Sequence, residues 1–180
     1  MMASGPGKAR PSGAFDAPSR GPREYVRVRP MEERDLHRVA RVEAASFSVP
    51  WSPRSFHRLL DRPDVLCRVL EWGEGGSPPE VVGHAVLWRL ADEAELANIA
   101  VAPEVRGRGL GARLLDAVLD EALQWPVVRI YLEVRRSDAR AQGLYRSRGF
   151  ERLGLRRNYY RSPREDAVVM VRLVDSSADA

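Results

Sequence analysis

Hydrophobic and polar positions alternate with two different periods along the chain, and these periods predict a mixed order of strands and helices. Near residue 25, Val26 and Val28 alternate with Arg27 and Arg29, as in a half-buried strand. Six further segments are predicted to be strands: 65–70, 81–90, 95–101, 127–134, 150–155 and 167–173. Because the first three of these six follow one another through short polar turns, we expect them to form an antiparallel meander.

Apolar residues at helical spacing predict four helices, two of them before the meander. The first carries Leu36, Ala40, Glu43 and Phe47 on one stripe, and Glu43 is its only charged member. We expect this carboxylate to be a boundary residue that reaches water; a role in a site is the less favoured alternative. The second helix begins where a serine N-cap precedes a proline in the first turn. Its buried face consists of Phe56, Leu59 and Leu60.

Two more helices are predicted after the meander. One ends before Pro126 and buries six apolar residues at helical spacing: Leu110, Leu114, Leu115, Val118, Leu119 and Ala122. The other is capped by Ser137 or Asp138 and runs to about residue 148, where Gly149 ends it. The complete order is β-α-α-β-β-β-α-β-α-β-β, which defines an α+β class with a helical crossover at its centre.

Composition sets the domain limits and excludes several classes of protein. Residues 24–174 form the predicted domain, 175–180 a tail, and 1–23, rich in glycine, proline and serine, an expected disordered leader. The single cysteine, Cys67, excludes an internal disulfide and any metal site built from cysteines, and we expect no metal. No apolar run is long enough to cross a bilayer, so we expect no membrane partner. With no export signal and no disulfide, the expected location is the cytoplasm.

The net charge of +4 comes almost entirely from arginine. Acidic residues are mixed with the arginines throughout, whereas a nucleic-acid interface usually shows a clustered basic patch. We therefore expect no direct binding to nucleic acid, and the expected oligomeric state is a monomer.

The most informative segment is a glycine-rich turn at the start of the third predicted helix. Gly107, Gly109 and Gly111 occupy alternate positions and allow a ligand to approach the backbone closely. The helix start supplies unpaired N–H groups and the positive end of the helix dipole. Arg106 and Arg108 add fixed positive charge. Together these features favour a ligand that carries phosphate, and the pyrophosphate of a cofactor is the leading candidate.

The same glycines also satisfy the loose dinucleotide-binding pattern, with Glu133 at a plausible distance for a ribose contact. Three features count against this alternative. The glycines lie beyond a proline-containing segment, antiparallel-looking strands precede them, and too few residues follow for further β-α-β units. No Gly-Lys-Ser/Thr follows the turn, which excludes a P-loop nucleotide triphosphatase. A turn that merely starts a helix is the remaining structural alternative.

At this point the sequence resembles the GNAT acetyltransferase superfamily, whose acyl-CoA signature is Gln/Arg-x-x-Gly-x-Gly/Ala. Arg106, Gly109 and Gly111 match that signature in full. Eight flanking stretches look like those of the ribosomal-protein-alanine N-acetyltransferases: EAASF at 43–47, PWS at 50–52, NIAV at 98–101, YLEVR at 131–135, LY at 144–145, GF at 149–150, RRNYY at 156–160 and REDA at 164–167. The resemblance covers about residues 25–173. It implies the GNAT acyl-CoA N-acyltransferase fold, with a central, mostly antiparallel sheet and helices on both faces.

The resemblance also implies acetyl-CoA as co-substrate and residues that bind it. The backbone of a strand segment would hold the pantetheine arm, namely Ile99, Ala100 and Val101. The glycine turn would hold the pyrophosphate, through Arg106, Gly107, Arg108, Gly109, Leu110, Gly111 and Ala112. Asp138 stands where the family commonly has an asparagine that contacts the cofactor. An aspartate caps a helix equally well, but it cannot donate a hydrogen bond when ionised.

Glu133 corresponds to the general base of the family and Tyr145 to its general acid. Acetyl transfer needs both, because a carboxylate can take the amine proton and a phenol can donate a proton to the departing sulfur. Trp51, Tyr159 and Tyr160 would flank the groove for the acceptor peptide. Each assignment has a structural alternative: an ion pair of Glu133 with one of two arginines on its own strand, Arg135 or Arg129; core packing for Tyr145; and a hydrophobic lid for the other aromatic residues.

The acceptor implied by the resemblance is the N-terminal alanine of a small-subunit ribosomal protein. Acid–base magnitudes favour the same kind of acceptor. A free α-amine has a pKa of about 7.7–8.0, so about a tenth is neutral at pH 7, whereas neutralising a lysine costs about 4–5 kcal/mol. The alternatives are a lysine or small-amine acetyltransferase on the same fold, and a non-catalytic basic module that binds RNA or ribosomal particles.

Overall fold

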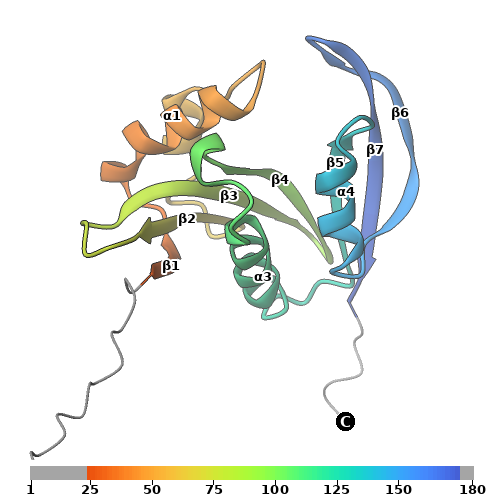
Figure 1. Ribbon diagram of the computed structural model, residues 1–180. Helices are drawn as coiled ribbons and strands as arrows, with labels where there is room; N and C mark the ends of the chain where they lie inside the picture. The colour runs from red at the N-terminus through yellow and green to blue at the C-terminus, as the bar shows by residue number, and fades with distance from the viewer. Residues whose placement is uncertain (1–23, 175–180) are drawn as a thin grey trace, which may run out of the picture.

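The computed structural model describes residues 24–174 (Figure 1). The leader predicted for residues 1–23 and the tail predicted for 175–180 lie outside this described part. Within it, the strands and α-helices follow the predicted order, with two 3-10 turns added. Their bounds are β1 Tyr25–Pro30, η1 Glu33–Asp35, α1 Leu36–Ser46, α2 Pro53–His57, β2 Val65–Gly73, β3 Glu80–Leu90, β4 Glu93–Val101, η2 Pro103–Val105, α3 Leu110–Ala122, β5 Arg129–Arg135, α4 Ala139–Arg146, β6 Glu151–Arg161 and β7 Arg164–Leu173.

The strands of the described residues form one seven-stranded sheet in the order β1-β2-β3-β4-β5-β7-β6. All neighbouring pairs are antiparallel except β4 and β5, which run parallel. Parallel neighbours need a crossover connection, and α3 lies in the connection between these two strands. The predicted antiparallel meander and the mostly antiparallel sheet are therefore confirmed.

Helices cover both faces of the sheet (Figure 1). On one face, α3 packs against β2, β3 and β4, and all six of its predicted core residues are buried. On the same side α4 lies over β5, and its Tyr145 belongs to the same apolar cluster as the α3 side chains. The other face carries α1 and α2, with a second cluster around Val39, Phe56 and Cys67. No helix within residues 24–174 is long and apolar enough to span a membrane.

Side-chain caps begin α2 and α4. Ser52 Oγ accepts a hydrogen bond from the N–H of Ser55 at 3.2 Å, as the serine–proline pair predicts. Of the two candidates for α4, Asp138 is the cap, because its Oδ1 accepts a hydrogen bond from the N–H of Ala141 at 2.8 Å. After α4, Gly149 adopts a φ of 79°, a left-handed conformation that favours glycine and ends the helix.

Two segments differ from their predictions. In α1 the buried residues are Val39, Val42 and Glu43, whereas Phe47 follows the helix and is 36% exposed. Phe47 lies past the last helical residue and has extended backbone angles (φ −125°, ψ 140°), so it leaves the face that Val39 and Glu43 share. The β6–β7 hairpin is also longer than predicted, since β6 continues to Arg161. Its polar side chains are tolerated because β6 is an edge strand.

Strands β4 and β5 pair at one end only. Their register joins Glu93–Leu96 to Arg129–Leu132 and stops there, and Figure 1 shows the two strands diverging beyond this point. Just past the last pair, β4 contains a bulge: Ala97 is the extra residue between Leu96 and Asn98, which face adjacent residues of β3. A bulge re-aims the side chains that follow it. The sheet is therefore open at its centre. At the same point the bulge changes the sheet face toward which the following β4 side chains point.

Candidate active site

A cleft of about 650 Å³ occupies the opening between β4 and β5. It is bordered by the two diverging strands, the connection from α1 to α2, the start of α4 and the β6–β7 hairpin. It brings together seven of the residues predicted for the site: Trp51, Ile99, Glu133, Asp138, Tyr145, Tyr159 and Tyr160. These residues come from five separate segments of the chain, so the fold assembles what the sequence only suggested.

The predicted pyrophosphate turn lies outside this cleft, between the end of β4 and the start of α3. Gly107 and Gly109 have φ values of 87° and 78°, which side chains other than glycine rarely adopt. A Cβ atom on Gly109 would meet nothing within 4 Å, so open space adjoins its backbone. The first amides of α3, those of Leu110 and Gly111, precede any helical acceptor and remain free to bind an anion. The turn thus has the geometry of a backbone cradle.

The two arginines of the turn have different surroundings. Arg106 ties the turn to its neighbours, because its Nε donates to Val101 O at 2.8 Å and its Nη2 to Ser46 Oγ at 2.9 Å. Arg108 lies over the Trp72 ring, with 4.9 Å between the guanidinium carbon and the ring centroid. Arg106 therefore positions the turn in this structure, whereas Arg108 lies at its exposed edge and forms an ion pair with Glu74 at 3.3 Å.

Part of the β4 backbone faces the opening. The N–H of Ala102 donates to Val82 O at 2.8 Å. Because hydrogen-bonded pairs alternate along an antiparallel ladder, the polar groups of Ala100 also face β3, and those of Ile99 and Val101 face the cleft. The Val101 carbonyl already accepts the Arg106 bond, so Ile99 presents the groups that a ligand could meet. The predicted role of Ala100 has no such backbone support.

Glu133 projects from β5 with a side chain that is 13% exposed, and it forms an ion pair with Arg156 of β6. The alternative predictions that it would pair with Arg135 or Arg129 are wrong. Those arginines pair with carboxylates of β7 and β4 instead. The true partner was missed because Arg156 reaches across β7 from the edge strand, a contact that spacing within β5 cannot reveal. Arg156 itself is 61% exposed, so it can move away without disturbing the core.

The groups around Glu133 have perturbed acid–base properties. Burial, and then the neighbouring Glu133 charge, raises the pKa of Glu95 above its ordinary value. The interaction with the Glu133 carboxylate, and then burial, raises the pKa of Tyr159 to about 12. Burial is also the main reason why the pKa of Tyr160 is raised to about 12. Both phenols therefore stay protonated at neutral pH, and two carboxylates lie close together on one face of the sheet.

Tyr145 of α4 borders the same cleft and is almost completely buried. Its ring packs edge-on against Phe150, with centroids 5.9 Å apart, so the core-packing interpretation is correct for the ring. Burial, and then the charge of Asp138, raises the pKa of its phenol well above the ordinary value. The hydroxyl group thus remains a proton donor at neutral pH. Packing thus fixes the ring at the wall of the cleft.

Aromatic residues stand on two sides of the cleft. Trp51 packs against Phe56 and Trp88, with ring centroids 5.5 Å and 6.1 Å away. Tyr159 and Tyr160 contact each other edge-on with centroids 5.2 Å apart. Trp51 belongs to the α1–α2 connection, and the two tyrosines belong to the β6–β7 hairpin. These two segments meet where Ser48 Oγ donates to Ser162 O. Arg135 donates to both of those oxygens, at 3.1 Å and 3.0 Å. This bridge covers one side of the opening.

A buried polar cluster supports the Trp51 side and was missed by the sequence analysis. The prediction that Glu43 reaches water is wrong, because it is 1% exposed. One carboxylate oxygen accepts from the N–H of Trp51 at 2.9 Å and from Asn98 Nδ2 at 3.1 Å. The other lies 2.9 Å from Nε2 of the fully buried His84. The signal that could have revealed this cluster is a lone carboxylate on an apolar helical stripe, because a charge buried there requires such partners.

The described residues offer neither a metal site nor a reactive cysteine. Within residues 24–174, no group of three or more histidine, cysteine, aspartate or glutamate side chains is arranged to hold a metal ion. Cys67 is buried, and burial raises the pKa of its thiol to about 11, so it is a poor nucleophile at neutral pH. Within the described part of the chain, the candidate chemistry therefore lies in the cleft and the glycine turn.

Comparison with known proteins places this arrangement in a family. The sequence profile described as the acetyltransferase (GNAT) family matches residues 36–150, a stretch that runs from α1 to the end of α4 and includes the glycine turn. The chain therefore belongs to the GNAT acetyltransferase family, and it is an N-acetyltransferase.

The more similar relatives define a type within that family. N-alpha-acetyltransferase RimI of Mycobacterium tuberculosis is 40% identical over 155 residues, which cover 83% of this chain and 93% of the relative. The [ribosomal protein bS18]-alanine N-acetyltransferase of Escherichia coli is 34% identical over 142 residues, 78% of this chain and 92% of the relative. The crystal structure of the ribosomal-protein-S18-alanine N-acetyltransferase from Escherichia coli matches with a TM-score of 0.74 at 32% identity, covering 86% of this chain and 97% of that structure. The chain is thus similar to RimI-type enzymes over nearly their whole length.

Proposed function

We propose that the protein transfers the acetyl group of acetyl-CoA to the N-terminal α-amine of a protein, specifically the N-terminal alanine of a small-subunit ribosomal protein. One observation carries this proposal: Glu133 and Tyr145, a carboxylate and a protonated phenol, border the same cleft where β4 and β5 separate. Relatives named for alanine acetylation of ribosomal protein bS18 are similar in sequence to most of this chain, which supports the substrate class.

The residues present fit acetyl-CoA, which supplies the acetyl group as an activated thioester. The free amides of Leu110 and Gly111 would hold its pyrophosphate, beside the open space at Gly109. The outward-facing backbone of Ile99 would bind the pantetheine arm as an added strand does. We expect only a small contribution from Asp138, since its Oδ1 caps α4 and an ionised aspartate has no hydrogen bond to donate. The glycine turn and Ile99 lie at the same end of β4, so one extended molecule can reach both.

Glu133 is the proposed general base. An α-amine must lose its proton before it can attack a thioester, and a carboxylate within reach directly or through one water can accept that proton. Arg156 forms an ion pair with the Glu133 carboxylate before the acceptor arrives. Because Arg156 is largely exposed, the ammonium group of the acceptor can take its place beside Glu133.

Tyr145 is the proposed general acid. The sulfur that leaves needs a proton, because a thiol has an ordinary pKa near 8.5 and is a better leaving group when protonated. The raised pKa of Tyr145 guarantees a proton on its hydroxyl at neutral pH. Its ring is held by Phe150 and gives the hydroxyl a fixed position at the cleft wall.

The covered entrance favours a chain end over a side chain on a folded surface. The bridge of Ser48, Arg135 and Ser162 joins the α1–α2 connection to the β6–β7 hairpin, and we place the passage for the acceptor between Trp51 and the tyrosine pair, which line the same cleft. A flexible N-terminus can thread such a passage in an extended form. The lower pKa of an α-amine adds to this preference, because less free energy is needed to neutralise it.

The test is acetylation of two matched peptides by the purified protein with acetyl-CoA, followed by mass spectrometry. One peptide has a free N-terminal alanine and no lysine; the other has a blocked N-terminus and one lysine. We expect acetylation of the first only, and a fall of kcat by about 100-fold or more in Glu133→Gln. Modification of the lysine peptide alone would overturn the choice of acceptor. Unchanged kcat in Glu133→Gln would overturn the assigned base.

A further inference from the structure

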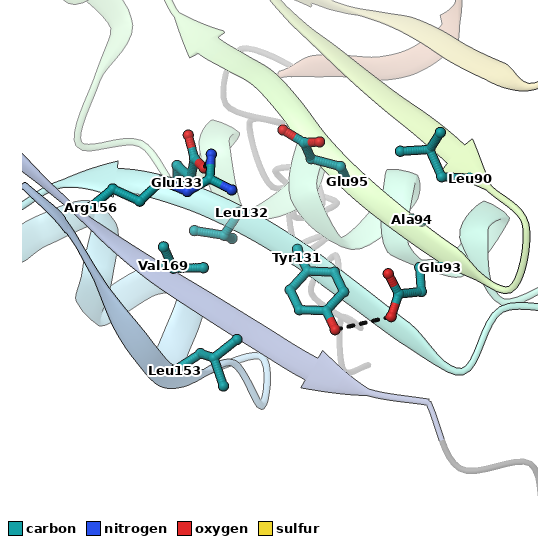
Figure 2. A pocket seen from close by; sticks show the side chains of 10 residues that line it. All are labelled: Leu90, Glu93, Ala94, Glu95, Tyr131, Leu132, Glu133, Leu153, Arg156 and Val169. Atoms are coloured by element: carbon teal, nitrogen blue, oxygen red, sulfur yellow. Dashed lines mark hydrogen bonds and ion pairs between the residues drawn. The ribbon is translucent and has the colours of Figure 1, made fainter. Parts of the chain in front are cut away.

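A second cavity adjoins the cleft on the sheet face that carries Glu133 (Figure 2). This side groove has a volume of about 290 Å³ and lies over β4, β5 and the β6–β7 hairpin. Its walls include Leu90, Leu153 and Val169, and its polar lining includes Glu93, Glu95 and Glu133. Glu95 and Glu133 also border the main cleft, so the two cavities meet at these carboxylates. A molecule bound at Glu133 can therefore extend directly into the side groove.

The charge of the side groove is negative. Three carboxylates line it against one guanidinium, that of Arg156, which is paired with Glu133. Glu93, at the outer end, accepts hydrogen bonds from Tyr131 at 3.1 Å and from Arg129 at 3.3 Å. Glu95 differs from Glu93 and Glu133, which each have side-chain partners. Burial and neighbouring charge alone perturb it, and no side-chain hydrogen bond or ion pair involves it within residues 24–174. Among residues 24–174, the half-buried carboxylate at the inner end of the groove therefore has no hydrogen-bond or ion-pair partner, and the nearby Arg156 charge offsets only part of the effect of burial and of Glu133.

An unpartnered carboxylate in a half-buried position is costly unless a ligand supplies a cation. Figure 2 shows Glu95 projecting from β4 on the same side as Glu133, with Leu90 and Leu153 on opposite sides of the groove. The aliphatic walls suit the methylene stem of a long basic side chain, whose charged head would reach a carboxylate. An acidic side chain would meet like charge on both strands.

We propose that the side groove is a specificity site for the acceptor, in which Glu95 binds a basic side chain, arginine or lysine, at the second or third residue of the acetylated chain. The inference rests on the proposed function, because it requires the α-amine of the acceptor to lie at Glu133. From that point, an extended chain advances about 3.3–3.6 Å per residue. Glu95 and Glu93 are two positions apart on one strand, a span of about 7 Å. The second and third side chains are therefore those within reach of the groove.

The experiment measures kcat/KM for peptides that share a free N-terminal alanine and differ at position two or three. At each position arginine, glutamine or glutamate is tested. We expect arginine to exceed glutamate by about 10- to 100-fold at one of the two positions, the range that a charge-assisted hydrogen bond gives. The ratio should shrink in 0.5 M salt, because screening weakens a partly exposed ion pair.

Glu95→Gln removes the charge and keeps the size of the side chain. It should lower the arginine-to-glutamate ratio to about threefold or less, whereas Glu151→Gln, on the exposed start of β6, should leave the ratio unchanged. Glu93→Gln is a second variant, in which the ratio should fall by a smaller factor because Glu93 already has partners.

The outcomes separate this inference from the proposed function. If no alanine peptide is acetylated, the proposed function fails and the inference fails with it. If every peptide is acetylated at a similar rate, the function stands and the inference alone is wrong. A preference for glutamate, or an arginine preference that survives intact in Glu95→Gln, would also overturn it. If a variant does not fold, the arginine-to-glutamate ratio of the unmodified protein still tests the inference, because a ratio near one would overturn it.

Discussion

Replacing Gly109 by alanine separates the conformational role of this glycine from its role in ligand binding. Gly109 has a φ of 78°, and a Cβ atom built on it would meet nothing within 4 Å. Gly149 at the end of α4 has a φ of 79° and equally open surroundings. The two glycines therefore carry the same backbone strain on substitution and the same absence of clashes. They differ in that only Gly109 adjoins the predicted pyrophosphate cradle.

The expected loss of stability is the same for both variants. A left-handed conformation costs a non-glycine residue about 1–2 kcal/mol. For a domain of this size, each kcal/mol lowers Tm by about 2–4 °C, so Gly109→Ala and Gly149→Ala should both melt about 2–8 °C below the unmodified protein. This part of the prediction depends on the backbone alone.

Acetyl-CoA distinguishes the two variants. At a concentration 100 times Kd, a ligand stabilises the folded state by about 2.7 kcal/mol, and a tenfold loss of affinity reduces this to about 1.4 kcal/mol. The acetyl-CoA-induced rise in Tm should therefore be about halved or less in Gly109→Ala and unchanged in Gly149→Ala. Differential scanning fluorimetry with and without acetyl-CoA measures both effects. Equal ligand-induced shifts in the two variants would refute the cradle at Gly109.

Three further predictions concern the cleft and the core. Tyr145→Phe should lower kcat by about 100-fold or more, because it removes the proposed proton donor. Tm should stay within about 2 °C, because no hydrogen bond contributes to the pKa shift of the Tyr145 hydroxyl and the ring packing is retained. Stopped assays measure kcat and calorimetry measures Tm, and a large loss of Tm would contradict the prediction. Glu43→Ala should cost about 3–5 kcal/mol in urea unfolding, because His84, Asn98 and the Trp51 amide lose a buried partner; a cost below about 1 kcal/mol would show that the cluster contributes little. Cys67 should react with iodoacetamide at pH 8 at least about 100-fold faster in urea than in the native protein, because burial raises its pKa from 9.0 to about 11. The raised pKa stabilises the folded state below pH 9, and this contribution is lost as the pH rises toward 11.

The order of strands and helices was accessible from the sequence because local periodicity encodes it. The α3 segment shows this best, since its six apolar residues at helical spacing are the six that the structure buries. The caps of α2 and α4 follow from side-chain chemistry within three residues. Such features depend on neighbours along the chain, and they were predicted correctly.

Features that depend on distant residues were harder to predict. Glu43 was placed at the surface because one helix gives no view of His84 and Asn98, which come from two different strands. The partner of Glu133 was assigned within its own strand, whereas Arg156 comes from β6, two strands away in the sheet. The end of pairing between β4 and β5 is likewise set by tertiary packing. Residue type indicated where chemistry lies, but only the register shows which groups meet.

The opening between β4 and β5 has an energetic consequence that connects the fold to binding. Backbone groups left unpaired inside a sheet must bond to water or to a ligand, because an unsatisfied buried group costs free energy. Here the opening is supported from two directions. The Glu43 cluster holds Asn98 of β4 and the segment around Trp51. Arg135 joins Ser48 of the α1–α2 connection to Ser162 of the β6–β7 hairpin. A cleft held open in this way does not have to be formed when the ligand arrives. Binding should therefore avoid most of the ordering cost of a flexible site, and the proposed pairing of an acyl donor with Ile99 would complete a ladder that the fold leaves unfinished.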